Sequence, residues 1–346
     1  MKLFPEKLIE YLLKKITRPL RRIIERYEFK NYRKLPFYKI KEIIKTKYNI
    51  KQYEYVNYNK YYQHGLVIKK FAGFIDTFKL PVSLKHGVQI NTYCTAGEIE
   101  NDLPGLFVFS ERSKAIFSEK TDKEIYAIGP YIYYAEPLLT LEEFKKEKNR
   151  LGKSLLIMPL HSDVYAEVSY DDYEHLSKIK EIAKKFDTVR VCLHWYDIKH
   201  NMYDHYIKQG WECVSAGHEE NHLFMSRLKS IIQLSDAVLS DGVSTHIGYA
   251  MLLNKPNYLV QTDMGLKNTA NLDYITDELL YSFIEGPVIE EFFRIFSRYD
   301  MTITQEQRDL VDTYWGLSSL RSKEEMHEII LKLDQKHREF LSSGNK

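Results

Sequence analysis

Short apolar runs alternate with amphipathic stretches along most of this chain, in the order expected of strands and helices. In the first half, apolar runs predict strands over 65–71 ("GLVIKKF"), 80–88 ("LPVSLKHGV"), 105–109 and 125–130. A helix is expected to begin near Ser110, directly after the third of these runs. Strands that alternate with helices are typical of a parallel sheet covered on both faces.

The second half repeats this alternation more regularly. A charged helix is expected over 140–151, and its end at Gly152 marks the predicted domain boundary. Five predicted strands then cover 154–162, 188–197, 211–217, 236–241 and 257–260, and helices separate them over 171–186, 201–210, 221–234 and from about Thr245. The sequence therefore predicts an α/β protein with two βα-type domains in series, over 47–150 and 151–305, followed by C-terminal helices over 306–346.

The first 46 residues form a separate basic segment. Apolar residues recur at helical spacing over 5–26, and the opposite face carries almost only Lys and Arg. Residues 1–45 hold 14 Lys and Arg against 5 Glu. A helix of this kind binds an anionic membrane surface, or it packs on the protein's own core with a solvated basic face. The pattern leaves both interpretations open.

Composition narrows the class of protein. The 346 residues are 44% hydrophobic and 28% charged, as in globular proteins, and no apolar run is long enough to span a bilayer. Three cysteines without metal-type spacing predict a reducing compartment, and the N-terminus lacks a signal-peptide pattern. A net charge of +2 gives no reason to expect nucleic-acid binding. We therefore expect a cytoplasmic protein, held at most peripherally on a membrane.

Polar residues that can carry chemistry follow the predicted strands. His86 follows a strand of the first half, and four strands of the second half end at or near a histidine: His161, His194, His218 and His246. In open α/β sheets, ligands bind at the carboxyl ends of the strands. These histidines are therefore expected to surround a ligand.

The turn "DGVSTH" at 241–246 joins a strand to a helix. A helix that begins near Thr245 offers unpaired N–H groups to an anion, Ser244 or Thr245 can cap it, and Gly242 permits close approach of a ligand. His246 in the first turn suits a phosphate oxygen. The alternative is a capped helix in which His246 only packs. Glycines spaced as in the dinucleotide fingerprint and a Gly-x-Ser-x-Gly elbow are both missing from the sequence, which disfavours an NAD enzyme and an α/β-hydrolase.

An ordered series of motifs resembles GT-B glycosyltransferases of bacterial surface polysaccharide synthesis. "SDAVLSDGVSTHIGYAMLLNKPNYLV" (235–260) is similar to their donor-binding segment, and "LKHGVQIN" (84–91) with "PGLFVFSERSKAIFSEK" (104–120) is similar to their acceptor domain. CDP-glycerol glycerophosphotransferases carry a similar His-Gly turn. Their Asp-Tyr-Ser-Ser and His-Gly-Thr are replaced here by "DGVS" (241–244) and "HGV" (86–88). The resemblance implies two Rossmann-like domains that face a central cleft.

The resemblance also implies roles for particular residues. His86 would accept the proton of the attacking hydroxyl, with Glu98 and Glu111 as rival bases. The donor's phosphates would be held by one set of residues and its base or ribose by another: His161, Ser162, Gly242, Ser244, Thr245 and His246 for the phosphates, and Gly217, His218 and Glu220 for the base or ribose. Glu219 and Glu220 also fit a plain helix-capping cluster.

The expected activity is glycosyl transfer from a nucleotide-sugar to a glycan or lipid-linked acceptor. The mechanism is expected to be inverting, because the Glu-x7-Glu spacing of retaining enzymes is missing, with no cofactor and no metal. Transfer of glycerol phosphate or pyruvate on the same scaffold is the nearest alternative. A nucleotide-sugar 2-epimerase is a third, and a non-enzymatic binding protein is a fourth. Acceptor-free product formation would single out the epimerase.

Overall fold

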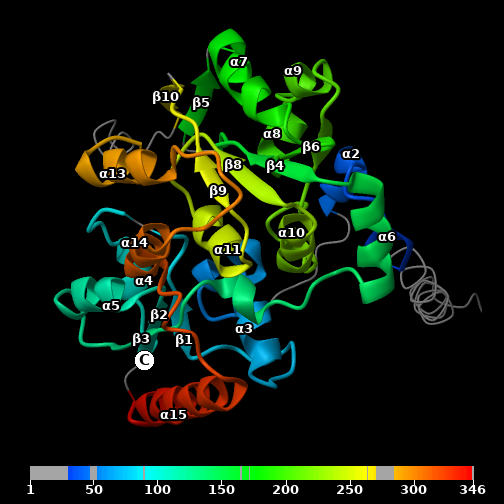
Figure 1. The fold of residues 1–346 in the computed structure, drawn as a ribbon. Coiled ribbons are helices and arrows are strands. Elements are labelled where there is room, and N and C mark those ends of the chain that lie inside the picture. The colour runs from blue at the N-terminus through cyan, green and yellow to red at the C-terminus, as the bar shows by residue number, and fades with distance from the viewer. Residues whose placement is uncertain are drawn as a thin grey trace, which may run out of the picture.

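The fold consists of two parallel α/β sheets stacked around a shared interior, with a long C-terminal helix that returns to the first sheet (Figure 1). This architecture confirms the expected α/β class with two Rossmann-like domains. The computed structural model describes residues 30–46, 53–88, 90–163, 166–170, 172–262, 264–269 and 284–344. The basic segment 5–26 lies outside the described residues, and the domain boundaries stay predictions.

The first sheet has three parallel strands in the order β1-β2-β3, with bounds Val82–Leu84, Gly105–Val108 and Glu124–Ala127. Strands β1 and β2 are fully buried because helices cover both faces, whereas residues of the edge strand β3 alternate between buried and partly buried. The helical elements of this domain are η2 (Asn57–Gln63), α3 (His64–Phe71), α4 (Ala96–Ile99), α5 (Glu111–Ser118) and η3 (Tyr131–Tyr134). Helix α5 begins where the sequence predicted, because the Ser110 hydroxyl accepts the backbone N–H of Ser113.

The predicted strand over 65–71 is wrong, because these residues form helix α3. The run is short and contains Val67 and Ile68, whose β-branched side chains favour strands only weakly against tertiary contacts. Lys69 is buried, forms an ion pair with Glu54, and donates hydrogen bonds to three backbone carbonyls. These long-range contacts, which local sequence does not encode, outweigh the apparent strand pattern.

The second sheet has five parallel strands in the order β7-β6-β4-β8-β9. Their bounds are Ser154–Met158 for β4, Thr188–Cys192 for β6, Glu212–Val214 for β7, Ala237–Ser240 for β8 and Asn257–Leu259 for β9. The strand order reverses between β4 and β8, whose register pairs Leu155 with Ala237. In doubly wound sheets such a reversal leaves a crevice at the carboxyl ends of the two strands.

Helices flank this second sheet, and most match the predicted ones. Their bounds are Leu141–Leu151 for α6, Asp172–Ala183 for α7, Trp195–Lys199 for α8, Asp204–Ile207 for α9, Phe224–Gln233 for α10 and His246–Leu252 for α11. Helix α6 ends at Gly152, as predicted. Of the predicted helix over 201–210, only the residues of α9 are helical. Helix α8 and an antiparallel strand pair, β5 (Ala166–Tyr170) with β10 (Met264–Asn268), were not predicted from the sequence.

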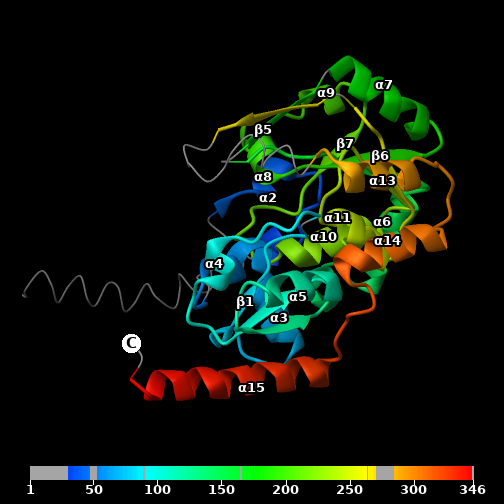
Figure 2. The same ribbon diagram turned by 90° about the vertical axis from the view of Figure 1, so that its left-hand side faces the viewer.

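The C-terminal helices join the two domains. Their bounds are Pro287–Phe296 for α13, Gln305–Trp315 for α14 and Lys323–Ser342 for α15. Trp315 is fully buried beside Gly248 of α11, and its indole N–H donates to the Thr245 carbonyl. Helix α15 then crosses to the first domain (Figure 2), where its Leu333 packs against Gly105 of β2. No helix among the described residues is long and apolar enough to cross a membrane.

Candidate functional site

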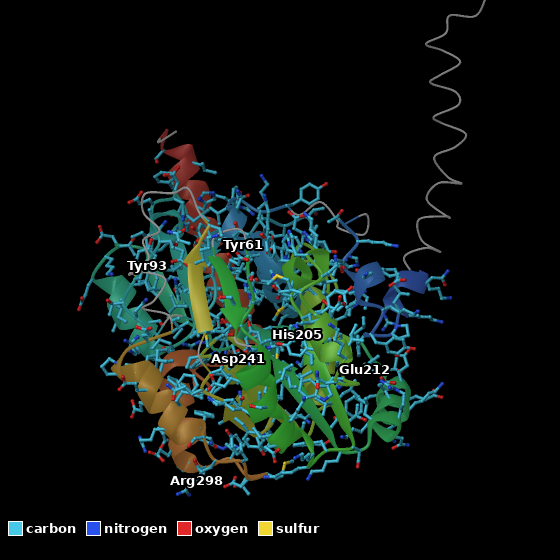
Figure 3. All side chains as sticks on the ribbon, turned by 90° about the horizontal axis from the view of Figure 1, so that it is seen from above. Tyr61, Tyr93, His205, Glu212, Asp241 and Arg298 are labelled. Carbon is cyan, nitrogen blue, oxygen red and sulfur yellow. The ribbon has the colours of Figure 1, made fainter. Side chains whose placement is uncertain are left out.

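A cavity of about 390 Å³ lies where the carboxyl ends of the two sheets meet. It opens at the β4–β8 reversal, the place where a doubly wound sheet binds its ligand. Figure 3 labels Tyr61, whose ring packs on His86, and Asp241, whose carboxylate accepts the N–H of the lining residue Leu160. Its lining includes Tyr62, His64, His86, Gly87, Val88, His161, Asp163, His194, Phe224, Ser244, Thr245, His246 and Tyr249. The cavity therefore collects residues from both domains.

Five of the protein's 12 histidines line this cavity. They are His64, His86, His161, His194 and His246. Burial is the largest cause that lowers the pKa of each ring. The pKa of His86 falls to about 4 and that of His246 to about 3. All five imidazoles are therefore neutral at pH 7, a state in which each has one nitrogen that accepts a proton or a hydrogen bond.

His86 lies directly after β1, as predicted, and its ring faces the cavity. Its backbone N–H donates to a Glu98 carboxylate oxygen at 3.1 Å. Glu98 is fully buried and forms an ion pair with Lys85 at 2.9 Å, so it is not free to act as a base. Glu111 is exposed on α5, beside Lys114, and does not contribute to the cavity wall. Geometry thus favours His86 over both of its rivals.

Replacement of Lys85 by methionine is expected to destabilise the fold by about 3–5 kcal/mol, because Glu98 would remain buried without its counter-charge. The double variant Lys85→Met/Glu98→Gln is expected to recover part of this loss, since it leaves no buried charge. Urea unfolding monitored by circular dichroism measures both free energies. A loss of less than about 1 kcal/mol in the single variant would contradict a structural role for the pair.

His161 and Ser162, predicted to act together, lie on different sides of the strand end. The His161 ring lines the main cavity and stacks on His194, with 3.9 Å between ring centroids. Its Nδ1–H donates to the Ser162 carbonyl at 3.1 Å, which leaves Nε2 as the acceptor in the neutral ring. The Ser162 hydroxyl accepts the Val168 N–H at 3.0 Å.

Ser162 belongs instead to a second cavity, of about 270 Å³. Asp197 lines the same space and accepts the Ser162 N–H at 3.2 Å. Burial, the largest cause, raises the pKa of the Asp197 carboxyl to about 7. Only His161 of the predicted pair is therefore placed to meet a ligand in the main cavity.

The turn after β8 is held by contacts within the protein. The two ring nitrogens of His246 bond to the hydroxyls of Ser240, at 2.5 Å, and Ser244, at 2.8 Å. The Thr245 hydroxyl accepts the Val88 N–H from the first domain at 3.1 Å. Helix α11 begins without the side-chain cap expected from Ser244 or Thr245. A side chain at Gly242 would collide with Leu160, so its small size serves this packing.

Gly217, His218 and Glu220, predicted to bind a base or ribose, do not contribute to the lining of the main cavity. Gly217 has a φ of +105° and lies against Arg227. His218 packs on Trp195 at 4.4 Å, and its Nδ1 accepts the N–H of the exposed Glu220. The neighbouring Ala216 does line the cavity, so this strand end borders the site without placing the three predicted residues in it.

Among the lining residues that the sequence did not indicate are Tyr62, His64, Phe224 and Tyr249. Tyr62 and His64 precede the segment misassigned as a strand. The "QHG" at 63–65 was the available signal, because a histidine lies there beside Gly65, which packs too closely on Asn59 to carry a side chain. Phe224 and Tyr249 lie on α10 and α11, where their apolar rings are indistinguishable from ordinary core residues.

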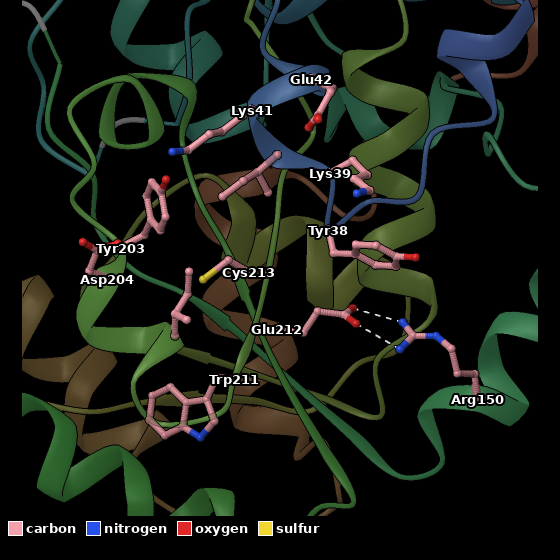
Figure 4. A pocket seen from close by; sticks show the side chains of 12 residues that line it. Tyr38, Lys39, Lys41, Glu42, Arg150, Tyr203, Asp204, Trp211, Glu212 and Cys213 are labelled. Carbon is pink, nitrogen blue, oxygen red and sulfur yellow. Dashed lines mark hydrogen bonds and ion pairs between the residues drawn. The ribbon is translucent and has the colours of Figure 1, made fainter.

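A larger groove of about 840 Å³ lies elsewhere, at the amino end of the edge strand β7 (Figure 4). Arg150 and Glu212 form a two-contact ion pair at its rim, at 2.9 and 3.0 Å. Tyr203 and Trp211 also line it. Ligands of doubly wound sheets bind at the opposite, carboxyl end of the strands, so the smaller cavity is the candidate site. Among the described residues, no three His, Cys, Asp or Glu side chains come together as metal ligands would.

Comparison with known proteins gave only distant structural likenesses. No family model and no curated protein matches the sequence. A glycosyltransferase from Rickettsia africae aligns at 14% identity and a TM-score of 0.34, over 75% of this chain and 71% of the other. The wall teichoic acid polymerase TagF aligns at 15% and 0.41, over 77% and 69%.

A UDP-GlcNAc 2-epimerase from Methanocaldococcus jannaschii, in complex with UDP-GlcNAc and UDP, aligns at 12% identity and a TM-score of 0.36. That alignment covers 67% of this chain and 61% of the other. Likenesses at these TM-scores carry no argument about activity.

Proposed function

We propose that this protein transfers a glycosyl group from a nucleotide-activated donor to a hydroxyl of a glycan or lipid-linked saccharide. One observation carries the proposal. The ligand crevice of the second sheet is closed by the carboxyl end of the first sheet, and the first sheet contributes a neutral imidazole, His86, to the shared cavity. Such a site can receive a donor from one domain and an acceptor, with its base, from the other.

The donor side is formed by the loops that follow β4 and β8. Ser244 and Thr245 line the cavity there and offer hydroxyl donors to phosphate oxygens, whereas the free Nε2 of neutral His161 is an acceptor suited to a hydroxyl of the donor. His246 would act through Ser244, because its own ring nitrogens are both engaged. No Lys or Arg is among the described residues that line the cavity. Neutral hydrogen-bond donors would therefore carry the recognition of the phosphates within the described part of the site.

The chemical step is a single displacement. The acceptor oxygen attacks the anomeric carbon, the bond from that carbon to the donor's phosphate oxygen breaks, and His86 takes the hydroxyl proton. A bound, negatively charged donor raises the pKa of His86 above about 4 by Coulombic attraction, which makes the ring a better base. One displacement inverts the configuration, and no step in this scheme calls for a metal or cofactor.

Three parts of the proposal rest on the sequence. A role in bacterial surface polysaccharide synthesis, such as capsule or lipopolysaccharide, follows from the stated resemblance. A cytoplasmic location, peripheral on the inner face of the membrane, follows from the basic segment 5–26. Transfer of glycerol phosphate or pyruvate, and nucleotide-sugar 2-epimerisation, remain the alternative chemistries for the same cavity.

A thermal-shift screen tests the donor site. One nucleotide among UDP, GDP, CMP, CDP and dTDP is expected to raise Tm by several degrees at about 100 times its Kd, because binding contributes about 2.7 kcal/mol. His246→Ala is expected to show a smaller rise, since loss of the ring frees Ser244. The exposed His200→Ala serves as the matched control.

The matching nucleotide-sugars then separate the chemistries. Product that needs an added acceptor supports transfer, whereas an epimer formed without acceptor supports the epimerase. If none of the five nucleotides shifts Tm and none of the matching sugars is consumed, the proposed function is wrong.

A further inference from the structure

The His86 ring is held by aromatic packing. Neither ring nitrogen bonds to any of the described residues, and Nδ1 is buried without a partner. The Tyr62 ring lies almost parallel to it, at 10° and 5.6 Å between centroids, and the Tyr61 ring lies at 57° and 4.8 Å. A catalytic histidine is commonly oriented by a hydrogen bond to its second nitrogen. In this protein, stacking on Tyr62 replaces that hydrogen bond as the contact that orients the ring.

Tyr62 itself is fixed by an unusual backbone. Tyr62 and Gln63 both have left-handed conformations, with φ of 49° and 67°, which are unfavourable for residues with side chains. Gln63 and Asn59 are fully buried. The Asn59 side chain donates to the Val82 carbonyl at 2.8 Å and accepts the Leu84 N–H at 3.0 Å, so it ties η2 to β1. Strain that persists through such over-determination is typical of functional sites.

Tyr62 also reaches the second domain. Its hydroxyl lies 3.5 Å from His194 Nε2, and its ring packs on Phe224 of α10 at 4.9 Å. His194 in turn stacks on His161, on the donor side of the cavity. One side chain therefore contacts the candidate base of the first domain and two rings of the second.

We propose that Tyr62 is a positioning residue: its ring holds His86 in the orientation that accepts the acceptor's proton, and its contacts with His194 and Phe224 make that orientation depend on the approach of the two domains. The role in proton transfer rests on the proposed function. The orientation of His86 does not, and it is measurable without any substrate.

The surroundings of His86 define the expected titration. Burial is the largest cause that lowers its pKa, Lys85 and His161 lower it further, and Glu98 and Asp163 raise it. Besides the rings of Tyr61 and Tyr62, the imidazole of His64 lies beside it. Loss of the Tyr62 ring would admit water to the buried face of His86. The pKa would then rise from about 4 towards its ordinary value of about 6.5.

The first experiment follows the ring resonances of isotope-labelled histidine by NMR as pH is varied, with His86 assigned from His86→Gln. In Tyr62→Leu we expect the His86 pKa to rise by at least about one unit. In Tyr62→Phe, which keeps the stacked ring, we expect little change. Tyr133→Leu is the matched control, an exposed tyrosine of the same domain outside the cavity. If Tyr62→Leu does not fold, Tyr62→Met replaces it.

The second experiment measures kinetics and nucleotide affinity. Tyr62→Leu is expected to lower kcat about 100-fold and to leave the nucleotide Kd within about threefold, because the ring positions the base and does not hold the donor. Tyr62→Phe is expected to lower kcat about threefold to tenfold, through the lost hydroxyl contact with His194.

An unmoved His86 titration in Tyr62→Leu overturns the proposal, and an unchanged kcat in Tyr62→Phe overturns its inter-domain part. Should the wild type transfer no sugar, the proposed function fails, while the NMR comparison still decides whether the packed Tyr62 ring shields His86 from water.

Discussion

Replacement of His86 by glutamine is expected to lower kcat by about two to four orders of magnitude, the range that removal of a general base produces. The nucleotide Kd should change little, because His86 belongs to the first domain and the donor is expected on the second. Glutamine retains hydrogen-bonding capacity and similar bulk but cannot take the proton. Steady-state kinetics with the nucleotide-sugar found in the thermal-shift screen, together with calorimetric titration of the nucleotide, measure both quantities.

His161→Gln is the informative comparison, because His161 lines the cavity on the donor side and its acceptor Nε2 is suited to a hydroxyl of the nucleotide-sugar. It is expected to weaken donor binding more than it lowers kcat at saturating donor. The reverse result, with His86→Gln nearly fully active and His161→Gln inactive, would move the base to the second domain and contradict the mechanism. His200→Gln, an exposed histidine outside the cavity, controls for general effects of the substitution.

The folded protein is expected to lose stability steeply as pH falls from about 6.5 towards 4. The folded-state pKa is about 4 for His86 and about 3 for His246, against about 6.5 in the unfolded chain. Between these values the unfolded chain binds protons that the folded protein excludes. For each such group, the free energy of unfolding is highest above pH 6.5. It declines by about 1.4 kcal/mol per pH unit as pH falls towards the pKa of the folded state.

Other groups modify this slope. The pKa values of His64, His161, His194 and His218 are also lowered, mainly by burial, so they act in the same direction. Asp197 acts in the opposite direction, because its pKa of about 7 makes the folded state bind a proton below that pH. Between about pH 6.5 and 4, its effect on the free energy of unfolding cancels that of about one histidine.

Urea unfolding at several pH values between 7 and 4.5 measures the dependence. In His86→Gln the slope is expected to fall by about 1.4 kcal/mol per pH unit, the contribution of one proton. An identical slope in the wild type and in this variant would show that His86 is protonated as readily in the folded protein as in the unfolded chain. The exposed His200→Gln is expected to leave the slope unchanged.

The order of strands and helices was predictable from the sequence, because burial of a parallel strand on both faces demands a continuous apolar run. The central strands β4 and β8 of the second sheet and β2 of the first coincide with such runs, whereas the edge strands β3 and β7 and the strand β6 also contain charged residues. The places of His86, His161, His194 and His246 followed as well, since residues after parallel strands gather at one edge of the sheet. The sequence thus determined the fold class and four of the five cavity histidines.

Only the tertiary structure decided how these residues are used. Adjacent residues at a strand end point to opposite sides, so His161 and Ser162 enter different cavities. Long-range hydrogen bonds and ion pairs stabilise residues 64–71 as a helix. Such contacts also keep Tyr62 in a left-handed conformation beside His86. These contacts join residues far apart in the chain, and their free energy outweighs local preference. Local sequence therefore indicated where the chemistry lies, while packing between the two domains decided which side chains meet.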